Sequence, residues 1–377
     1  MNTLVIGNIM GGGRAALLIE NGIIKEVGFT GDIPQDTKLL DFGDSLILPG
    51  FVDIHVHGGD GFDFVDMERR SAHGIRDMHI KHGTTTLCPT LTSCGIQKTL
   101  EFLEFFKDYA DDPAFAGVHL EGPFLSADMC GAQNLSCLEM PTDENIAKIL
   151  EYSDIISSVT LAPELENCEK LIKSLKANGV RVSVGHINAS DDTLRRARDV
   201  GADKITHMYC ATPKRYKEGS YVIGGFEETA LTEDGLFLEL IADGHHVCRE
   251  CFEMAIRCKG IDNIIAVSDA MRGSGQDTDE SYLGEIKPEN RVIVEDGVAK
   301  LPDRSSFAGS VTNGEKMFEV LHKKYGYSIR DACRMLSENP ARYLGLEKLG
   351  RIEQGCIADL VIIDDFKVIE TIKNGRC

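Results

Sequence analysis

The sequence predicts an α/β fold, a (β/α)8 TIM barrel, with a small β-rich domain assembled from both ends of the chain. Through the middle of the chain, β-like runs follow one another with helical patterns between several of them, and parallel strands need such crossovers. Both ends are instead rich in short apolar runs separated by turn residues. A length of 377 residues, 42% of them hydrophobic, allows a core of this size.

The β-rich ends are the first elements to justify. Short strand-like runs lie near the start at 3–9, 15–22 and 23–28, and near the end at 350–365 and 368–377. Asn21 and Gly22 lie between two apolar runs, which is a strong hairpin signal. We therefore expect a small β-sandwich domain of residues 1–48 plus 349–377, and a catalytic barrel domain over residues 49–348.

The barrel strands come next along the chain. The β-like runs are 50–56, 84–90, 116–122, 158–164, 181–187, 204–210, 236–244 and 264–270. Helical patterns lie between several of them, at 74–83, 99–110 and 168–179. Two further amphipathic patterns, at 313–326 and 328–345, follow the last strand and are expected to close the barrel.

The composition argues against several classes of function. Forty basic against sixty acidic residues give a net charge of -20, which argues against a nucleic-acid-binding surface and against attraction to anionic membranes. No apolar stretch is long enough to span a bilayer, and the N-terminus lacks the features of a signal peptide. The twelve irregularly spaced cysteines are then expected to be reduced thiols in the cytoplasm.

Polar residues recur where the predicted barrel strands end, and these ends form the active-site rim of such barrels. The residues are His55, His57, His119, Glu121, His186, His207, His246 and Asp269. A single histidine at a strand end is more often a structural residue. His55 and His57, however, point to the same face of one strand, and further histidines and a carboxylate lie at other strand ends. This set predicts a metal site suited to zinc, iron or manganese, with Asp269 as the acid and base rather than a turn cap.

The motifs resemble a known family. "LPGFVDIHVHGG", "HLEGPF", "TLAPE", "GHINA", "ADGHHV", "SDA" and "AGS" occur in the order found in N-acetylglucosamine-6-phosphate deacetylases of the amidohydrolase superfamily. The resemblance covers nearly the whole chain. It implies the amidohydrolase type of barrel and a dimer or larger homo-oligomer. It also implies roles for individual residues: Glu121, His186 and His207 as principal metal ligands, His55 and His57 as ligands of a second ion, Asp269 as general base and acid, and His246 as a substrate contact.

The chain departs from the family pattern in the substrate motifs. Gln133 stands where the family usually has histidine, and Cys210 replaces an asparagine while the following Ala211 is kept. The family's downstream phosphate-binding arginine has no match. Either nearby cations, with Lys214 and Arg215 foremost and Lys217 and Arg272 as further candidates, replace that contact, or the substrate carries no phosphate.

The resemblance therefore implies a hydrolase of a linear amide bond that deacetylates N-acetylglucosamine 6-phosphate with one or two divalent ions, zinc foremost. The alternative is a deacylase of a different N-acyl amino sugar, with or without a phosphate. A third hypothesis is a metal-binding scaffold without activity, and a fourth is an amidohydrolase of cyclic amides or a deaminase. The expected partner is the small-molecule substrate, without nucleic acid or membrane.

Overall fold

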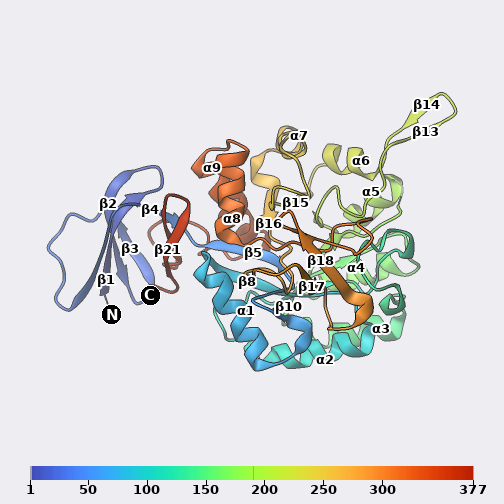
Figure 1. The fold of residues 1–377 in the computed structure, drawn as a ribbon, viewed down its shortest axis with the longest axis horizontal. Coiled ribbons are helices and arrows are strands. Elements are labelled where there is room, and N and C mark those ends of the chain that lie inside the picture. Colours follow the sequence, from blue (N-terminus) through green and yellow to red (C-terminus); the bar gives the residue numbers. More distant parts are fainter. Residues whose placement is uncertain (1, 190, 377) are drawn as a thin grey trace.

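The computed structural model describes residues 2–189 and 191–376. Met1 and Cys377, which bound the predicted small domain, lie outside these residues, as does Ser190. Figure 1 shows a barrel surrounded by helices, with a smaller sheet at one side that contains both chain ends.

The barrel is an eight-stranded parallel sheet in the order β16-β15-β12-β11-β10-β9-β8-β5. Its strands are β5 Phe51–Val56, β8 Thr84–Leu91, β9 Val118–Glu121, β10 Ile156–Leu161, β11 Arg181–Val184, β12 Lys204–Ile205, β15 Phe237–Ile241 and β16 Ile264–Val267. The ring closes where Asp269 N–H donates to His55 O at 3.0 Å and His57 N–H donates to Ala270 O at 2.8 Å. The predicted (β/α)8 barrel is confirmed.

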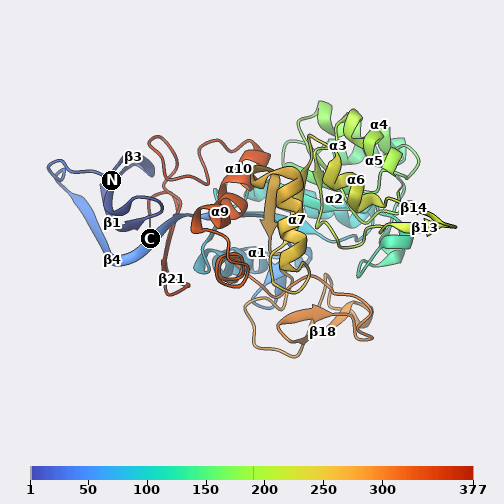
Figure 2. The same ribbon diagram turned by 90° about the horizontal axis from the view of Figure 1, so that it is seen from above.

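Helices cover the outside of the barrel (Figure 2). They are α1 Arg69–Lys81, α2 Ile96–Phe106, α3 Asp143–Leu150, α4 Cys168–Ala177, α5 Asp191–Val200, α6 Phe226–Thr232, α7 Arg249–Lys259, α8 Gly314–Glu319, α9 Ile329–Cys333 and α10 Asn339–Leu344. Residues 320–324 and 334–338 continue α8 and α9 as π-helical turns. In α4, Leu171, Ile172 and Leu175 recur at helical spacing and are fully buried, while its charged residues face solvent.

One predicted strand is much shorter than the sequence indicates. The run 204–210 is extended only through Ile205, because a tight turn follows in which His207 and Tyr209 have φ angles of 26° and 80°. These left-handed conformations interrupt strand geometry. The turn carries the His207 side chain over the end of the barrel.

Three insertions were not predicted. The hairpin of β13 Tyr216–Glu218 and β14 Tyr221–Ile223 projects away from the barrel after β12 (Figure 1). A three-stranded sheet of β17 Glu280–Tyr282, β18 Arg291–Glu295 and β19 Val298–Lys300 follows β16 and lies beside the barrel (Figure 2). A short hairpin of β6 Gly58–Gly59 and β7 Phe62–Asp63 follows β5.

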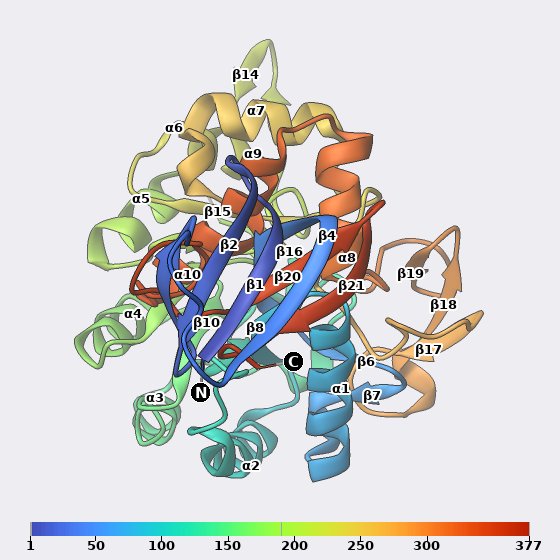
Figure 3. The ribbon, with the colours of Figure 1, turned by 90° about the vertical axis from the view of Figure 1, so that its left-hand side faces the viewer.

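Strands from both ends of the chain build the small sheet, as predicted (Figure 3). It consists of β1 Asn2–Ile9, β2 Gly13–Glu20, β3 Ile23–Val27, β4 Thr37–Pro49, β20 Leu360–Asp364 and β21 Lys367–Ile372 in the order β21-β20-β4-β1-β2-β3. A bridge between Ile23 and Ile357 brings edge strand β3 close to the segment before β20, so the sheet curls around its own apolar core. The boundaries at residues 48 and 349 stay predictions.

The small sheet and the barrel are joined through Gly50, between β4 and β5. A Cβ atom at this position would lie 2.3 Å from Thr85 Oγ1, so only glycine allows the chain to pass β8 this closely. The Gly50 N–H donates to Asp359 O at 2.9 Å. Within residues 2–189 and 191–376, no helix has the length and apolar character required to cross a lipid bilayer.

Candidate active site

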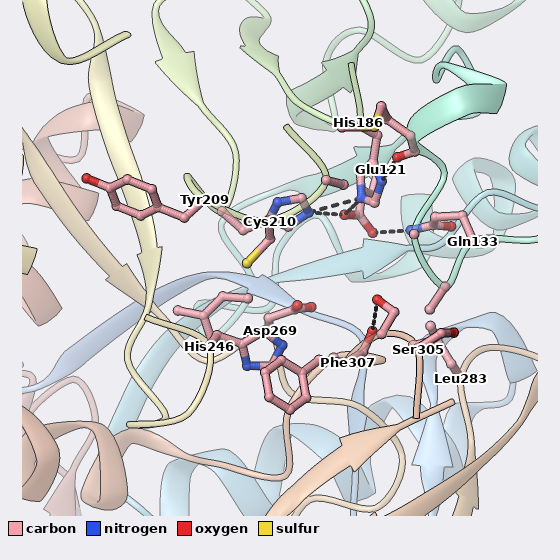
Figure 4. A pocket seen from close by; sticks show the side chains of 18 of the residues that line it. Glu121, Gln133, His186, Tyr209, Cys210, His246, Asp269, Leu283, Ser305 and Phe307 are labelled. Atoms are coloured by element: carbon pink, nitrogen blue, oxygen red, sulfur yellow. Dashed lines mark hydrogen bonds and ion pairs between the residues drawn. The ribbon is translucent and has the colours of Figure 1, made fainter. Parts of the chain in front are cut away.

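A cavity of about 580 Å³ lies at the carboxyl ends of the barrel strands. Ten of the predicted site residues line it: His57, Glu121, Gln133, His186, His207, Cys210, Ala211, Lys214, His246 and Asp269. His55 lies beneath the cavity in contact with His57, whereas Arg215 is exposed and is not part of the cavity wall. Figure 4 shows the side chains of Glu121, Gln133, His186, Cys210, His246 and Asp269 around the cavity.

Glu121 forms the centre of a first group with two histidines. Its Oε1 atom lies 3.0 Å from His186 Nε2 and 2.8 Å from His207 Nε2, and the two Nε2 atoms are 3.1 Å apart. Glu121 is the last residue of β9, and the histidines follow β11 and β12. All three side chains are buried.

A second group shares the same carboxylate. His55 Nε2 lies 3.2 Å from His57 Nε2 and 3.7 Å from Glu121 Oε1, while His57 Nε2 lies 3.3 Å from Glu121 Oε2. Asp269 Oδ1 lies 3.2 Å from His57 Nε2 and 3.5 Å from His55 Nε2. Glu121 therefore stands between two histidine pairs, and Asp269 stands beside one of them.

The donor set fits a divalent metal. His55 Nδ1 contacts Glu239 Oε1 at 2.8 Å, and His186 Nδ1 contacts Met129 O at 3.1 Å. Because both partners are acceptors, each Nδ1 carries a proton, and each Nε2 is the nitrogen that can bind a metal ion at the centre of its group. Buried imidazole nitrogens around one carboxylate are ligands that zinc, iron and manganese accept.

The electrostatics of the groups reflect this concentration of charge. Burial lowers the pKa of His57, but hydrogen bonds to Asp269 and Glu121 outweigh burial and raise that pKa to about 9. For Glu121, burial raises the pKa, but the charge of His55 and hydrogen bonds from His186, His207 and His55 hold it well below the usual range. Without metal, positive charge on His55 and His57 thus balances the carboxylates.

Gln133 contacts a predicted metal ligand in addition to lining the cavity. Its Nε2 donates to Glu121 Oε2 at 2.5 Å, and its Oε1 accepts from Ser93 N–H at 2.8 Å (Figure 4). Both ends of the amide are engaged, so Gln133 holds the Glu121 carboxylate in orientation. The role of substrate contact predicted for Gln133 stays a prediction.

His246 lies on the opposite wall of the cavity. Its Nδ1 contacts Asp243 Oδ2 at 2.7 Å, and Asp243 Oδ1 accepts from the backbone N–H groups of His245 and His246. The Phe307 ring packs against the His246 ring with centroids 4.6 Å apart (Figure 4). Because Nδ1 is engaged with Asp243, Nε2 is the nitrogen left for a ligand.

The cations proposed for the phosphate differ in their positions. Lys214 lines the cavity and is exposed, while Lys217 belongs to the projecting hairpin. Arg272 is engaged elsewhere: its guanidinium binds Asp66 Oδ1 at 2.6 Å and donates to Gly61 O and Gly284 O. Arg272 is not part of the cavity wall and its guanidinium is paired with Asp66, so its role as a phosphate ligand stays a prediction.

Cys210 and Ala211 line the cavity beside His207. The Cys210 N–H donates to His207 O at 2.9 Å, and Ala211 O accepts from Ile187 N–H at 3.2 Å. Burial raises the pKa of the Cys210 thiol, which keeps the group neutral and a weak hydrogen-bond donor.

Sequence reasoning missed two buried charges beneath the site. Lys204 and Glu239 are fully buried and form an ion pair, and Glu239 also contacts His55. The signal was present, since a glutamate interrupts the apolar run "LFLELIA" in the middle of a barrel strand. His119, the remaining histidine of the strand ends, contacts Thr160 Oγ1 at 2.8 Å inside the barrel and does not line the cavity.

Comparison with known proteins gives consistent matches. A family model described as the amidohydrolase family matches residues 46–377. The chain is 33% identical over 356 residues to the N-acetylglucosamine-6-phosphate deacetylase of Lysinibacillus sphaericus, covering 91% of this chain and 88% of that protein. It is 30% identical over 344 residues to the Homo sapiens protein of the same name, covering 86% of this chain and 81% of that protein.

Solved structures of N-acetylglucosamine-6-phosphate deacetylases also match this chain. A mutant N-acetyl-D-glucosamine-6-phosphate deacetylase from Mycobacterium smegmatis, in complex with N-acetyl-D-glucosamine-6-phosphate, superposes with a TM-score of 0.90 at 27% identity. The match covers 100% of this chain and 98% of that chain. N-acetylglucosamine-6-phosphate deacetylase from Pasteurella multocida gives a TM-score of 0.91 at 25% identity, covering 100% and 99%.

Proposed function

The chain belongs to the amidohydrolase family, and we propose that it is a metal-dependent hydrolase that removes the acetyl group from N-acetylglucosamine 6-phosphate. The products are acetate and glucosamine 6-phosphate. The observation that carries the proposal is the shared position of Glu121 between two histidine pairs, with Asp269 Oδ1 only 3.2 Å from His57 Nε2 in the same cavity.

We assign the metal ligands to the two groups around Glu121. Glu121, His186 and His207 hold the principal ion, and His55 and His57 with Glu121 hold a second ion where two are bound. Zinc is the proposed metal, with iron and manganese as alternatives. A divalent ion at this position supplies Lewis acidity toward the acetamide carbonyl and toward the attacking water.

The residues of the chain carry the proton transfers. Asp269 lies at the end of β16, in a left-handed backbone conformation with a φ angle of 50°, held by the Asp269 N–H to His55 O bond. From there its carboxylate accepts the proton of the attacking water. It then delivers that proton to the departing nitrogen, which leaves as the amine. Gln133 keeps Glu121 in place through its 2.5 Å hydrogen bond.

The opposite wall of the cavity is proposed to bind the sugar phosphate. His246 presents Nε2 to the cavity, since Nδ1 contacts Asp243, and Lys214 adds an ammonium group. Lys214 is the proposed substitute for the missing arginine of the family. Cys210 and Ala211 form the floor next to these groups.

A different N-acyl amino sugar is the second candidate substrate. The observation that favours it is the low positive charge of the cavity wall. Among the described residues that line the cavity, Lys214 is the sole lysine or arginine. A phosphate dianion would therefore rely on Lys214, His246 and backbone groups. We also propose that the protein acts in the cytoplasm as a homodimer or larger homo-oligomer.

The test is acetate release by protein reconstituted with Zn²⁺. The proposal predicts that N-acetylglucosamine 6-phosphate yields equal amounts of acetate and primary amine. Release of ammonia in place of acetate would identify a deaminase. Bound metal without hydrolysis of any acetamide would favour the inactive scaffold and would contradict the proposal.

A further inference from the structure

We propose that Glu239, charge-balanced by the buried Lys204, is a positioning residue that fixes both histidine pairs of the metal site from inside the barrel. The inference rests on the metal-dependent function proposed above and deepens it. Neither residue lines the cavity, so any effect on the site is transmitted through the residues they contact.

The barrel topology brings the two charges together. β12 and β15 are parallel neighbours with Lys204 opposite Phe237, and Glu239 lies two residues further along β15 on the same face as Phe237. Both side chains are fully buried and form an ion pair. Among the residues that the structure describes, Glu239 is the sole carboxylate paired with Lys204.

Glu239 uses its other oxygen on the metal site. Oε1 contacts His55 Nδ1 at 2.8 Å and accepts from the His207 backbone N–H at 3.2 Å. One carboxylate oxygen therefore contacts a member of each histidine pair. His55 belongs to the group with His57, and His207 belongs to the group with His186.

The contact with His55 sets the ring tautomer. An ionised carboxylate has no proton to donate, so His55 Nδ1 must be the donor and Nε2 must present its lone pair toward His57 and Glu121. The ring cannot rotate freely, because His119 packs edge-on against it with centroids 4.7 Å apart. The orientation of His55 thus depends on an acceptor at the Glu239 position.

The contact with His207 stabilises a strained turn. His207 has a φ angle of 26°, which is unfavourable for a residue with a side chain. Its N–H donates to Glu239 Oε1, and the next N–H, of Met208, donates to Glu239 O at 2.8 Å. Side chain and backbone of one residue therefore hold the turn that presents His207 to Glu121.

A stability role alone does not account for a pair of this kind. A buried ion pair is costly to desolvate, and apolar residues of similar size are often as stable. Polar partners behind metal-binding histidines, in contrast, typically raise metal affinity about 10- to 100-fold. We accordingly assign to the Lys204–Glu239 pair the role of holding the metal-binding histidines in position.

The test measures Zn²⁺ binding without substrate, so that its result is independent of the sugar specificity. Metal-free wild type, Glu239→Met and the double variant Lys204→Met/Glu239→Met are titrated with Zn²⁺ against a chromophoric chelator, because methionine has a similar length and removes the oxygen acceptor. The double variant removes the lysine that Glu239→Met would leave unpaired, and it keeps the test valid if the single variant does not fold. Glu315→Met is the control, because Glu315 is another buried carboxylate paired with a lysine, Lys367, away from the site.

We expect Zn²⁺ affinity to fall about 10- to 100-fold in both Glu239 variants and to stay at the wild-type value in Glu315→Met. Thermal unfolding of the metal-free proteins separates this effect from a loss of folding stability. Wild-type affinity in either folded Glu239 variant would overturn the positioning role. A wild type that binds no Zn²⁺ would instead overturn the proposed metal site.

Discussion

At the scale of single residues, Glu121 and Asp269 give the cavity its proposed chemistry. The sequence predicted these residues because polar side chains interrupt apolar runs at strand ends, and such ends meet on one rim. Glu239 interrupts an apolar run in the sequence, but its ion pair with Lys204 was not predicted, since the pairing between their strands becomes visible only in the folded barrel. The pairing of Arg272 with Asp66 was also not predicted, because the sequence alone does not reveal which carboxylate lies beside this arginine.

The role of Asp269 gives the first prediction. Asp269→Asn is expected to lower kcat for acetate release about 10²- to 10⁴-fold, because the amide cannot accept the proton of the attacking water. The metal-to-chain ratio, measured by elemental analysis, should stay close to that of the wild type, since the ligands of the principal group are unchanged.

The matched control for this prediction is Asp296→Asn. Asp269 and Asp296 both have left-handed backbone conformations, with φ angles of 50° and 56°, and asparagine tolerates this region well. Asp296 is exposed and is not part of the cavity wall, so this variant should keep wild-type activity. Undiminished turnover in Asp269→Asn would remove Asp269 from the mechanism.

At the scale of elements, the helices and strands of the barrel followed the sequence pattern, whereas the loops did not. Strong 3.6-residue periodicity predicted α4, and the buried strands read as apolar runs. The shortened β12 could not be predicted, because the left-handed turn at His207 depends on the hydrogen bond that the His207 N–H donates to Glu239. The β17–β18–β19 insertion also escaped prediction, since its short strands lie between loops.

The packing of α4 gives a prediction at this scale. Leu175→Ala removes a fully buried side chain and is expected to lower the free energy of unfolding by about 2 to 5 kcal/mol. Lys173→Ala on the exposed face of the same helix should change it by less than about 0.5 kcal/mol. Equal thermal midpoints for the two variants would contradict the described packing of α4 against the barrel.

At the scale of the whole molecule, the proposed metal site connects distant parts of the chain. The proposed ligands lie in or just after β5, β9, β11 and β12, so bound ions would connect strands around much of the barrel. An ion that binds only the folded state stabilises that state by mass action. The sequence predicted this assembly correctly as a barrel with a β-rich domain from both ends, since the order of elements constrains the topology.

Removal of the metal gives the corresponding prediction. Dialysis against a chelator should abolish acetate release and lower the thermal midpoint, and added Zn²⁺ should restore both. With free Zn²⁺ at about 100 times its dissociation constant, the stabilisation should be about 2.7 kcal/mol per site. Full activity in protein shown by elemental analysis to be metal-free would exclude a metal-dependent reaction.

The proposed substrate is tested by a paired determination of kcat/KM for N-acetylglucosamine with and without the 6-phosphate, using Zn²⁺-loaded wild type and Lys214→Ala. We expect the wild type to prefer the phosphorylated sugar and Lys214→Ala to lose this preference, because Lys214 supplies the ammonium group of the cavity wall. A wild type that prefers the unphosphorylated sugar would contradict the proposed substrate.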